Sequence, residues 1–330
     1  MYKKMAYEVM RGVMPRYKTR SGKAYAGDAM ELIKSIPDGS ISLIVTSPPH
    51  ALKNGKRYGN ADSKAYVRWF MFFADEFYRV LREDGNLVLS VGGDMVIGTS
   101  AESPRDLKLF TGFYENEKFH FKDEFAWASP TPSSAPADWI RIKRVGMKDA
   151  VNYVWWLTKN SRFNYGSRNA LSPYIRNVMR TINRRQYMEL RSLEHNADGP
   201  VLRDYRYSVL IKFLTLGDRE QDSRYAEACR KHNMKAHPTR YPLRLPEFFI
   251  KYLTEKGDVV LDPFAGSNAT GEAAEGIGRL WIAFEINTEY IDGSMFRFDV
   301  KRTQTALWKD HFYRQHSKDH RVKELMGKDI

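Results

Sequence analysis

The segment Thr46–His50, with the sequence TSPPH, combines residue types that could bind an amino group. Its two prolines lack backbone N–H groups, so they leave carbonyl oxygens that can only accept hydrogen bonds. The hydroxyl of Ser47 adds a further acceptor beside those carbonyls. The flat ring of His50 could stack on a planar base. The same residues would also suit an ordinary turn at the end of a strand.

A second segment, Asp262–Gly271 with the sequence DPFAGSNATG, has the features of a nucleotide-binding turn. Gly266 and Gly271 allow a tight turn and a close approach of the backbone to a ligand. Glu285 ends the next apolar run, where an acid suits two ribose hydroxyls. The glycine spacing differs from G-x-G-x-x-G and lacks a phosphate-binding lysine, so a cofactor without phosphates fits better. An ordinary glycine-rich connection is the alternative.

Both segments follow apolar, β-branched runs that predict buried parallel strands. In open α/β sheets, ligands bind at the carboxyl ends of such strands. We predict strands at 23–27, 41–47, 86–93, 121–129 and 150–159, helices at 28–36 and 65–81, turns at 37–40 and 82–85, a helix and turn within 243–258, and a strand–turn–helix–strand unit within 259–286. Loops are predicted at 51–64 and at 129–146, which is rich in proline and serine.

Composition narrows the class of protein further. The chain of 330 residues has a formal net charge of +13, which favours a polyanionic partner such as nucleic acid. A single cysteine, Cys229, excludes an intramolecular disulfide and a zinc cluster, and we expect no metal. The sequence shows no signal peptide and no apolar run of the ~18 residues that a membrane helix needs. We therefore expect a cytoplasmic protein without a membrane partner.

The segment TSPPH precedes DPFAGSNATG in the chain. In that order the two segments resemble the catalytic and cofactor motifs of the β-class amino-methyltransferases of DNA, which methylate cytosine N4 or adenine N6. The resemblance covers nearly the whole chain. Within this class, residues 27–60, 147–159 and 235–249 resemble the PvuII type of cytosine-N4 methyltransferase. It implies an α/β, Rossmann-like S-adenosylmethionine-dependent methyltransferase fold. That fold would be circularly permuted, with a mostly parallel sheet, helices on both faces and an inserted target-recognition region.

The resemblance also implies roles for individual residues. Ser47, Pro48 and Pro49 would hold the target amine, and His50 would stack on the flipped base. S-adenosylmethionine would be bound by Asp28, His237, Pro238, Asp262, Phe264, Gly266, Ser267 and Glu285, with Glu285 on the ribose and Asp28 near the adenine.

Two positions depart from the family pattern. The family prefers Tyr, Phe or Trp where this chain has His50. The strand at 86–93 carries an aspartate in the PvuII type, proposed there as a proton acceptor, but this chain has Ser90. Asp94 is a candidate substitute, although a solvated loop acid is the alternative reading.

We divide the chain into a catalytic half at 1–160, a target-recognition region at 161–235, a cofactor-binding half at 236–300 and a basic tail at 301–330. The region 161–235 holds fifteen Lys or Arg residues against eight Asp or Glu. Double-stranded DNA is the expected partner, and most of the basic contacts should be to phosphate. The candidate DNA-binding residues are Lys53, Lys56, Arg57, Arg141, Lys143, Arg144, Arg184 and Arg185.

The favoured function is therefore site-specific methylation of cytosine N4 in DNA, with base flipping, as part of a restriction-modification system with a possible cognate endonuclease. Serine at the start of the catalytic motif favours cytosine over adenine N6. A DNA-binding relative with impaired catalysis is a further alternative, whereas a small-molecule dehydrogenase fits poorly with the glycine spacing and the charge. The recognition sequence and the oligomeric state stay open.

Overall fold

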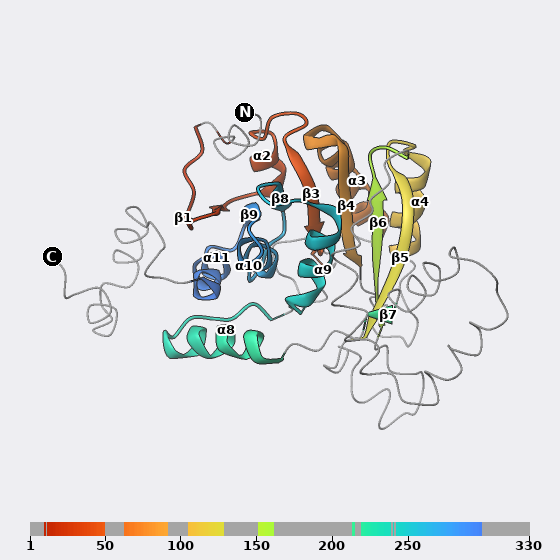
Figure 1. Ribbon diagram of the computed structural model, residues 1–330. Helices are drawn as coiled ribbons and strands as arrows, with labels where there is room; N and C mark the ends of the chain where they lie inside the picture. Colours follow the sequence, from red (N-terminus) through yellow and green to blue (C-terminus); the bar gives the residue numbers. More distant parts are fainter. Residues whose placement is uncertain are drawn as a thin grey trace, which may run out of the picture.

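The computed structural model describes residues 10, 12–49, 63–91, 105–128, 151–161, 213–214, 219–238, 240 and 242–298. Within these residues, one nine-stranded sheet runs in the order β1-β2-β9-β8-β3-β4-β6-β5-β7 (Figure 1). The strands are β1 Tyr17–Lys18, β2 Gly22–Ala26, β3 Ile41–Thr46, β4 Leu81–Val91, β5 His120–Ala128, β6 Val151–Thr158, β7 Phe213–Leu214, β8 Val259–Asp262 and β9 Leu280–Glu285. The helices are α2 Ala29–Ile33, α3 Ser63–Val80, α4 Arg105–Glu115, α8 Arg219–Lys231, α9 Arg244–Leu253, α10 Ala269–Gly276, α11 Thr288–Ser294 and the 3₁₀ turn η2 Met295–Arg297.

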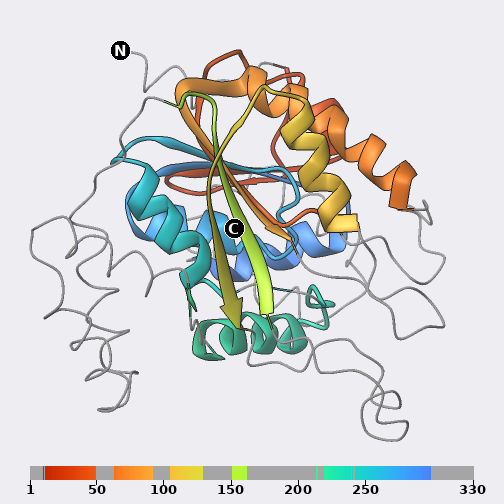
Figure 2. The same ribbon diagram turned by 90° about the vertical axis from the view of Figure 1, so that its right-hand side faces the viewer.

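The central strands β2, β9, β8, β3 and β4 are mutually parallel. Strand β6 lies antiparallel between β4 and β5, and the short β1 is antiparallel to β2. All the parallel strands therefore present their carboxyl ends at one edge of the sheet, which we call the carboxyl edge. Helix α8 lies beyond this edge (Figures 1 and 2).

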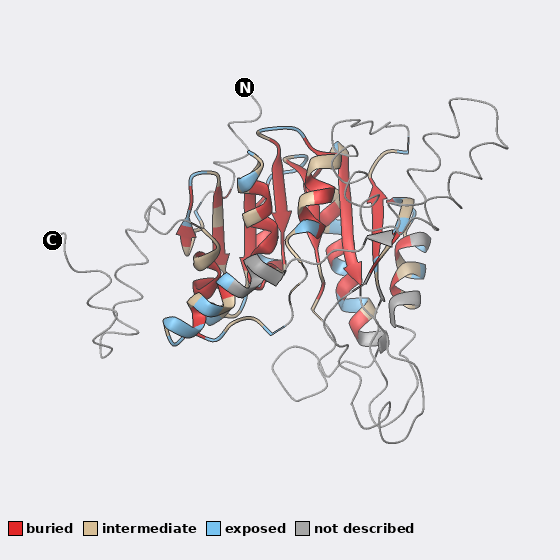
Figure 3. Cartoon of the chain, turned by 60° about the horizontal axis from the view of Figure 1, so that its bottom comes forward, coloured by how far each residue is buried: buried red, intermediate tan, exposed pale blue. Residues whose placement is uncertain are grey.

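Helices cover both faces of the sheet. Helices α2, α3 and α4 pack with Ile44, Leu87 and Phe284 on one face, and helices α9, α10 and α11 pack with Leu43 and Ala283 on the other. Every residue of β3 is buried, which explains its continuous apolar sequence in place of an alternating one. Figure 3 shows the strands as a buried layer. The predicted α/β class, with a mostly parallel sheet between two helical layers, is confirmed.

Several elements differ from the predictions. The turn expected at 82–85 lies inside the assigned bounds of β4, because Ile41 pairs with Leu81 while Leu43 pairs with Asn86. The intervening residues form an irregularity in the ladder and leave the pairing of β3 and β4 intact on either side. Helices α4, α8 and α11 and the short strands β1 and β7 were not predicted. Helix α8 falls within the predicted recognition region.

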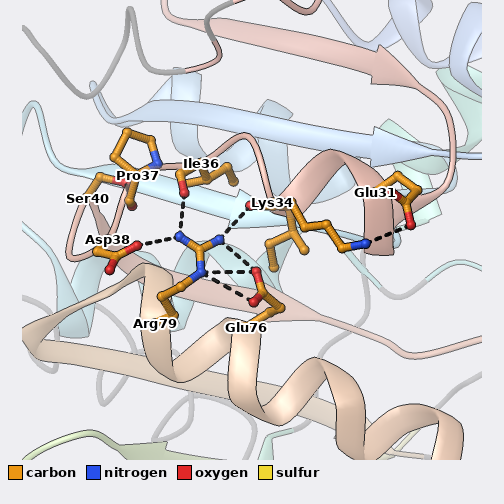
Figure 4. A network of polar contacts seen from close by, with 9 residues as sticks. Glu31, Lys34, Ile36, Pro37, Asp38, Ser40, Glu76 and Arg79 are labelled. Atoms are coloured by element: carbon orange, nitrogen blue, oxygen red, sulfur yellow. Dashed lines mark hydrogen bonds and ion pairs between the residues drawn. The ribbon is translucent and has the colours of Figure 1, made fainter.

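Arg79 of α3 fixes the turn that leads into β3 (Figure 4). Its guanidinium donates to the carbonyl oxygens of Ile33 and Ile36 and forms ion pairs with Glu76 and Asp38. Ile33 is the last residue of α2 and Ile36 lies in the turn that follows, so Arg79 supplies a partner that the helix itself cannot provide and also holds the turn. This cluster lies at the amino end of β3, opposite the carboxyl edge. No helix in the described ranges is long and apolar enough to span a bilayer.

Candidate functional site

The sheet brings the two predicted motifs together at the carboxyl edge. Strands β3 and β8 are parallel neighbours, so Thr46 and Asp262 end adjacent strands. Glu285 ends β9 beside β8 and pairs with Ala26 at the end of β2. Asp28 follows β2 and caps α2 by accepting a hydrogen bond from the Met30 N–H at 2.8 Å. Four strand ends thus contribute predicted site residues to one edge.

A buried hydrogen-bond bridge joins the two motifs directly. The Thr46 hydroxyl donates to Asp262 Oδ1 at 2.7 Å, and the Thr270 hydroxyl donates to Asp262 Oδ2 at 2.6 Å. The Phe264 N–H donates to Oδ1 at 3.1 Å. Asp262 is only 1% exposed, and buried carboxylates require such donors. Asp262 therefore links the end of β3 to the turn after β8, and its predicted contact with a cofactor stays a prediction.

The hydroxyl of Ser47 is oriented by the neighbouring strand. It donates a hydrogen bond to the carbonyl oxygen of Ser90 on β4 at 3.1 Å. Because the proton of the hydroxyl is engaged there, the remaining lone pairs of Ser47 Oγ are left to accept from another donor. Pro48 beside it is buried and Pro49 is half-buried. Ser90 thus lies next to the predicted catalytic segment and contacts Ser47 through its backbone carbonyl.

Glu285 organises the glycine turn after β8. Its carboxylate accepts the Gly266 N–H at 2.9 Å and the Asn287 N–H at 2.8 Å, one on each oxygen. Burial raises the pKa of the Glu285 carboxyl above its ordinary value, and these two N–H donors oppose that rise only in part. Each carboxylate oxygen of Glu285 can accept a further hydrogen bond at the carboxyl edge, and its predicted contact with a ribose stays a prediction.

Two glycines of the turn are required by its geometry. Gly266 has a φ of +51°, in the left-handed region, and a Cβ there would lie 3.0 Å from Nε2 of His237. Asn268 is also left-handed and accepts from the Gly271 N–H at 3.0 Å, so it caps α10. A Cβ on Gly271 would lie 2.3 Å from the Asn268 carboxamide oxygen. The predicted tight turn is therefore present.

The other predicted cofactor residues surround the same turn. The His237 ring lies against Gly266 and packs edge-on to Tyr290 at 4.6 Å between ring centroids. Phe264 packs against the aromatic residues of α3, at 5.0 Å from Phe73. Ser267 is buried, whereas Pro238 is exposed. The residues named from the resemblance are thus neighbours in space, although they come from widely separated parts of the sequence.

Part of the predicted site lies outside the described residues. His50 and the candidate acid Asp94 fall there. The candidate DNA-binding residues fall there as well: Lys53, Lys56, Arg57, Arg141, Lys143, Arg144, Arg184 and Arg185. In the part of the chain that is described, no group of three or more His, Cys, Asp or Glu side chains is arranged to hold a metal ion.

Sequence reasoning missed several residues that shape the site. Asn268 directly precedes a predicted helix, and asparagine is a strong N-cap residue, so this role had a readable signal. Thr46 was part of the catalytic segment but received no role. Arg297 contacts Ser267 of the glycine turn, and Tyr225 contacts Arg297 and His237, but nothing in the local sequence of either residue indicates these contacts.

Comparison with known proteins agrees with both the fold and the two motifs. A family model described as DNA methylase matches residues 41–296. The chain belongs to the DNA methylase family. Among curated relatives of this family, the type II methyltransferase M.PvuII of Proteus hauseri is 37% identical over 87% of this chain and 86% of its own length. The DNA adenine methyltransferase YhdJ of Escherichia coli K12 is 26% identical over 85% of this chain and 83% of its own length.

A solved structure supports the same assignment to the DNA methylase family. The structure titled PvuII DNA methyltransferase (cytosine-N4-specific) superposes with a TM-score of 0.72 and 33% sequence identity. The match covers 92% of this chain and 95% of the other. The similarity therefore extends beyond the two motifs to the arrangement of the strands and helices that position them.

Proposed function

We propose that this protein transfers a methyl group from S-adenosylmethionine to the exocyclic N4 of cytosine in double-stranded DNA. The observation that carries the proposal is the junction of β3 and β8. There the Thr46–Asp262 hydrogen bond joins the strand end that precedes Ser47 to the strand end that precedes the glycine turn. Membership of the DNA methylase family and the similarity to a cytosine-N4-specific enzyme support the choice of reaction.

The residues of the turn fit S-adenosylmethionine. Because Gly266 has no side chain, it leaves a space beside the His237 ring that a Cβ would fill. Glu285 offers carboxylate acceptors for ribose hydroxyls. Within the described part of the turn 263–268, no basic side chain is present to bind phosphate, which suits a cofactor that carries none. When bound, S-adenosylmethionine supplies an electrophilic methyl group on a positively charged sulfur.

Ser47 and Pro48 prepare the amine for attack. The lone pair of the cytosine amine is delocalised into the ring, which makes the nitrogen a poor nucleophile. Ser47 Oγ, whose own proton is held by the Ser90 carbonyl, accepts one N–H of the amine. The Pro48 carbonyl accepts the other. Two fixed acceptors favour a more pyramidal nitrogen with a localised lone pair, and positioning then supplies much of the rate.

The chain's cysteine argues against methylation of a ring carbon. That reaction uses a thiolate nucleophile, whereas Cys229 is fully buried on α8. Burial raises the pKa of the Cys229 thiol and so disfavours the thiolate. Direct transfer to the amine requires no covalent intermediate and no thiol: the N–CH3 bond forms as the S–CH3 bond breaks, the bonding pair stays on the sulfur of the departing thioether, and the nitrogen releases one proton to solvent. It does require that the target base leave the duplex and enter the pocket.

Our proposal for the DNA interface follows from the position of α8. This helix lies beyond the carboxyl edge and belongs to the proposed recognition region 161–235 (Figure 2). We place the DNA against this side of the protein and retain the basic residues predicted above as its phosphate contacts. A cognate restriction endonuclease would complete a restriction-modification system.

The test is a labelling experiment. Plasmid DNA is incubated with the protein and S-adenosylmethionine carrying a radiolabelled methyl group, then digested to nucleosides and separated. We expect label in N4-methylcytosine. Label in N6-methyladenine would assign the other reaction of the family, and absence of label despite DNA binding would refute catalysis.

A further inference from the structure

Arg297 forms a buried clamp beneath the glycine turn. Its side chain is only 2% exposed. Its Nε donates to the carbonyl oxygen of Ser267 at 2.7 Å, and its Nη2 donates to the hydroxyl of the same residue at 2.9 Å. Nη1 forms an ion pair with Glu272 in the first turn of α10 at 2.8 Å. One guanidinium therefore holds both the turn and the start of the helix that follows it.

The turn requires outside support of this kind. Ser267 lies between Gly266 and Asn268, which have φ values of +51° and +59°. Positive φ costs glycine little and costs asparagine less than other residues with a side chain, so the backbone on either side of Ser267 does not by itself fix one shape. The carbonyl and hydroxyl of Ser267 are both held by Arg297, so this one side chain sets how the central residue of the turn is oriented.

Arg297 is itself held by α8. Its guanidinium stacks over the ring of Tyr225 at 4.5 Å, and Tyr225 is fully buried. The Tyr225 hydroxyl also accepts the backbone N–H of His237 at 3.2 Å. Tyr225 thus contacts both the clamp and the residue that lies against Gly266. A planar guanidinium suits this place because it can stack and bind two acceptors at once, which a lysine cannot do.

We propose that Arg297 is a positioning residue that holds the turn Gly266–Asn268 in its cofactor-binding shape, with Tyr225 as its support. It acts through Ser267. The inference rests on the proposed function, because it assigns the turn to S-adenosylmethionine. It adds a link between the cofactor turn and α8, a helix that follows most of the proposed recognition region.

The decisive variant is Arg297→Lys, which keeps the charge but loses the paired hydrogen bonds to Ser267. Binding of S-adenosylmethionine to the protein without DNA is measured by calorimetry. We expect the Kd to rise about tenfold, the size expected for a lost hydrogen bond to a charged group. In the methylation assay, KM for the cofactor should rise while kcat at saturating cofactor stays near that of the wild type.

The matched control is Arg279→Lys. Arg279 also binds a hydroxyl and a carbonyl of one residue, Thr254, but it lies at the amino end of β9, away from the site. Both variants should lose thermal stability, and only Arg297→Lys should lose cofactor affinity. Equal Kd values for the two variants, with the wild type binding normally, would overturn the inference alone. Failure of the wild type to bind S-adenosylmethionine would instead overturn the proposed function together with this inference.

A second pair of variants decides the matter if Arg297→Lys does not fold. Tyr225→Leu removes the ring beneath Arg297, whereas Phe296→Leu removes a neighbouring aromatic contact, the stack of Phe296 on His232 at 4.8 Å. We expect a raised Kd for Tyr225→Leu and an unchanged Kd for Phe296→Leu. Wild-type affinity in Tyr225→Leu would overturn the inference.

Discussion

Replacement of Gly266 by alanine tests whether the shape of the turn controls cofactor binding. The residue has a φ of +51°, so an alanine there carries a backbone penalty of about 1 kcal/mol. The new Cβ would also lie 3.0 Å from His237 Nε2 and 3.1 Å from its Cδ2. Contacts this short force the imidazole or the turn to move by a few tenths of an ångström.

Gly39→Ala is a matched control for the backbone term. Gly39 has a φ of +60°, and a Cβ there would meet no atom within 4 Å. Its turn lies at the amino end of β3, away from the carboxyl edge. Both variants should therefore lose about 1 kcal/mol of stability, which corresponds to a fall in Tm of about 2–4 °C. Any further loss of Tm in Gly266→Ala, relative to Gly39→Ala, measures the effect of the contact with His237.

Calorimetry with S-adenosylmethionine and thermal unfolding give the two measurements. For Gly266→Ala we expect the Kd to rise about tenfold, equivalent to about 1.4 kcal/mol, because relief of the close contact displaces the cofactor surface. Gly39→Ala should bind as the wild type does. Wild-type affinity in Gly266→Ala, with the same loss of Tm as in the control, would refute the argument that this turn shapes the site.

Three further predictions concern the catalytic junction. Ser47→Ala should lower kcat about a hundredfold without changing cofactor affinity. The control Ser40→Ala also removes a hydroxyl that donates to a carbonyl, but at the amino end of β3, and it should leave kcat nearly unchanged. Equal activities of the two variants would remove Ser47 from catalysis. Thr46→Val and Thr270→Val each remove one donor from the buried carboxylate of Asp262, so each should lower the free energy of unfolding by about 1–3 kcal/mol in denaturant. Only Thr46→Val should also lower kcat. An equal effect of both variants on kcat would contradict a role of the Thr46–Asp262 bond in catalysis. Because the pKa of Glu285 is raised, the Kd for S-adenosylmethionine should increase as the pH falls through a midpoint higher than that of an ordinary glutamate, and Glu285→Gln should abolish this dependence. A wild-type profile that stays flat down to the pKa of an ordinary glutamate would refute the role of the carboxylate.

The raised pKa of Glu285 affects the stability of the protein without cofactor in the opposite direction: lowering the pH weakens cofactor binding but favours the folded state. The folded state binds the Glu285 proton more tightly than the unfolded state does. This group's contribution to stability is therefore fully present below the unfolded pKa and is lost as the pH rises through the folded pKa. At neutral pH the ionised carboxylate thus costs stability, and under the proposed role in ribose binding this is a common compromise at functional sites.

Local sequence determined the elements that carry the chemistry. The apolar runs before Ser47 and Asp262 predicted buried strands, and residues with special backbone properties marked where those strands end. Because ligands bind at the carboxyl ends of parallel strands, the position of both motifs directly after such strands also indicated one common site. Gly266 could be assigned to a tight turn since the reason is local: its backbone adopts a left-handed φ that favours glycine.

The contacts that hold this site were decided by tertiary structure. Thr46 meets Asp262 across 216 positions of sequence, and Arg297 reaches Ser267 from an element that shows no motif. The Ser47 hydroxyl is oriented by a backbone carbonyl of β4, and carbonyls are identical at every residue. The two segments, TSPPH and DPFAGSNATG, thus specified the chemistry through residue type, whereas the partners that orient them depend on which strands and helices become neighbours in the folded chain.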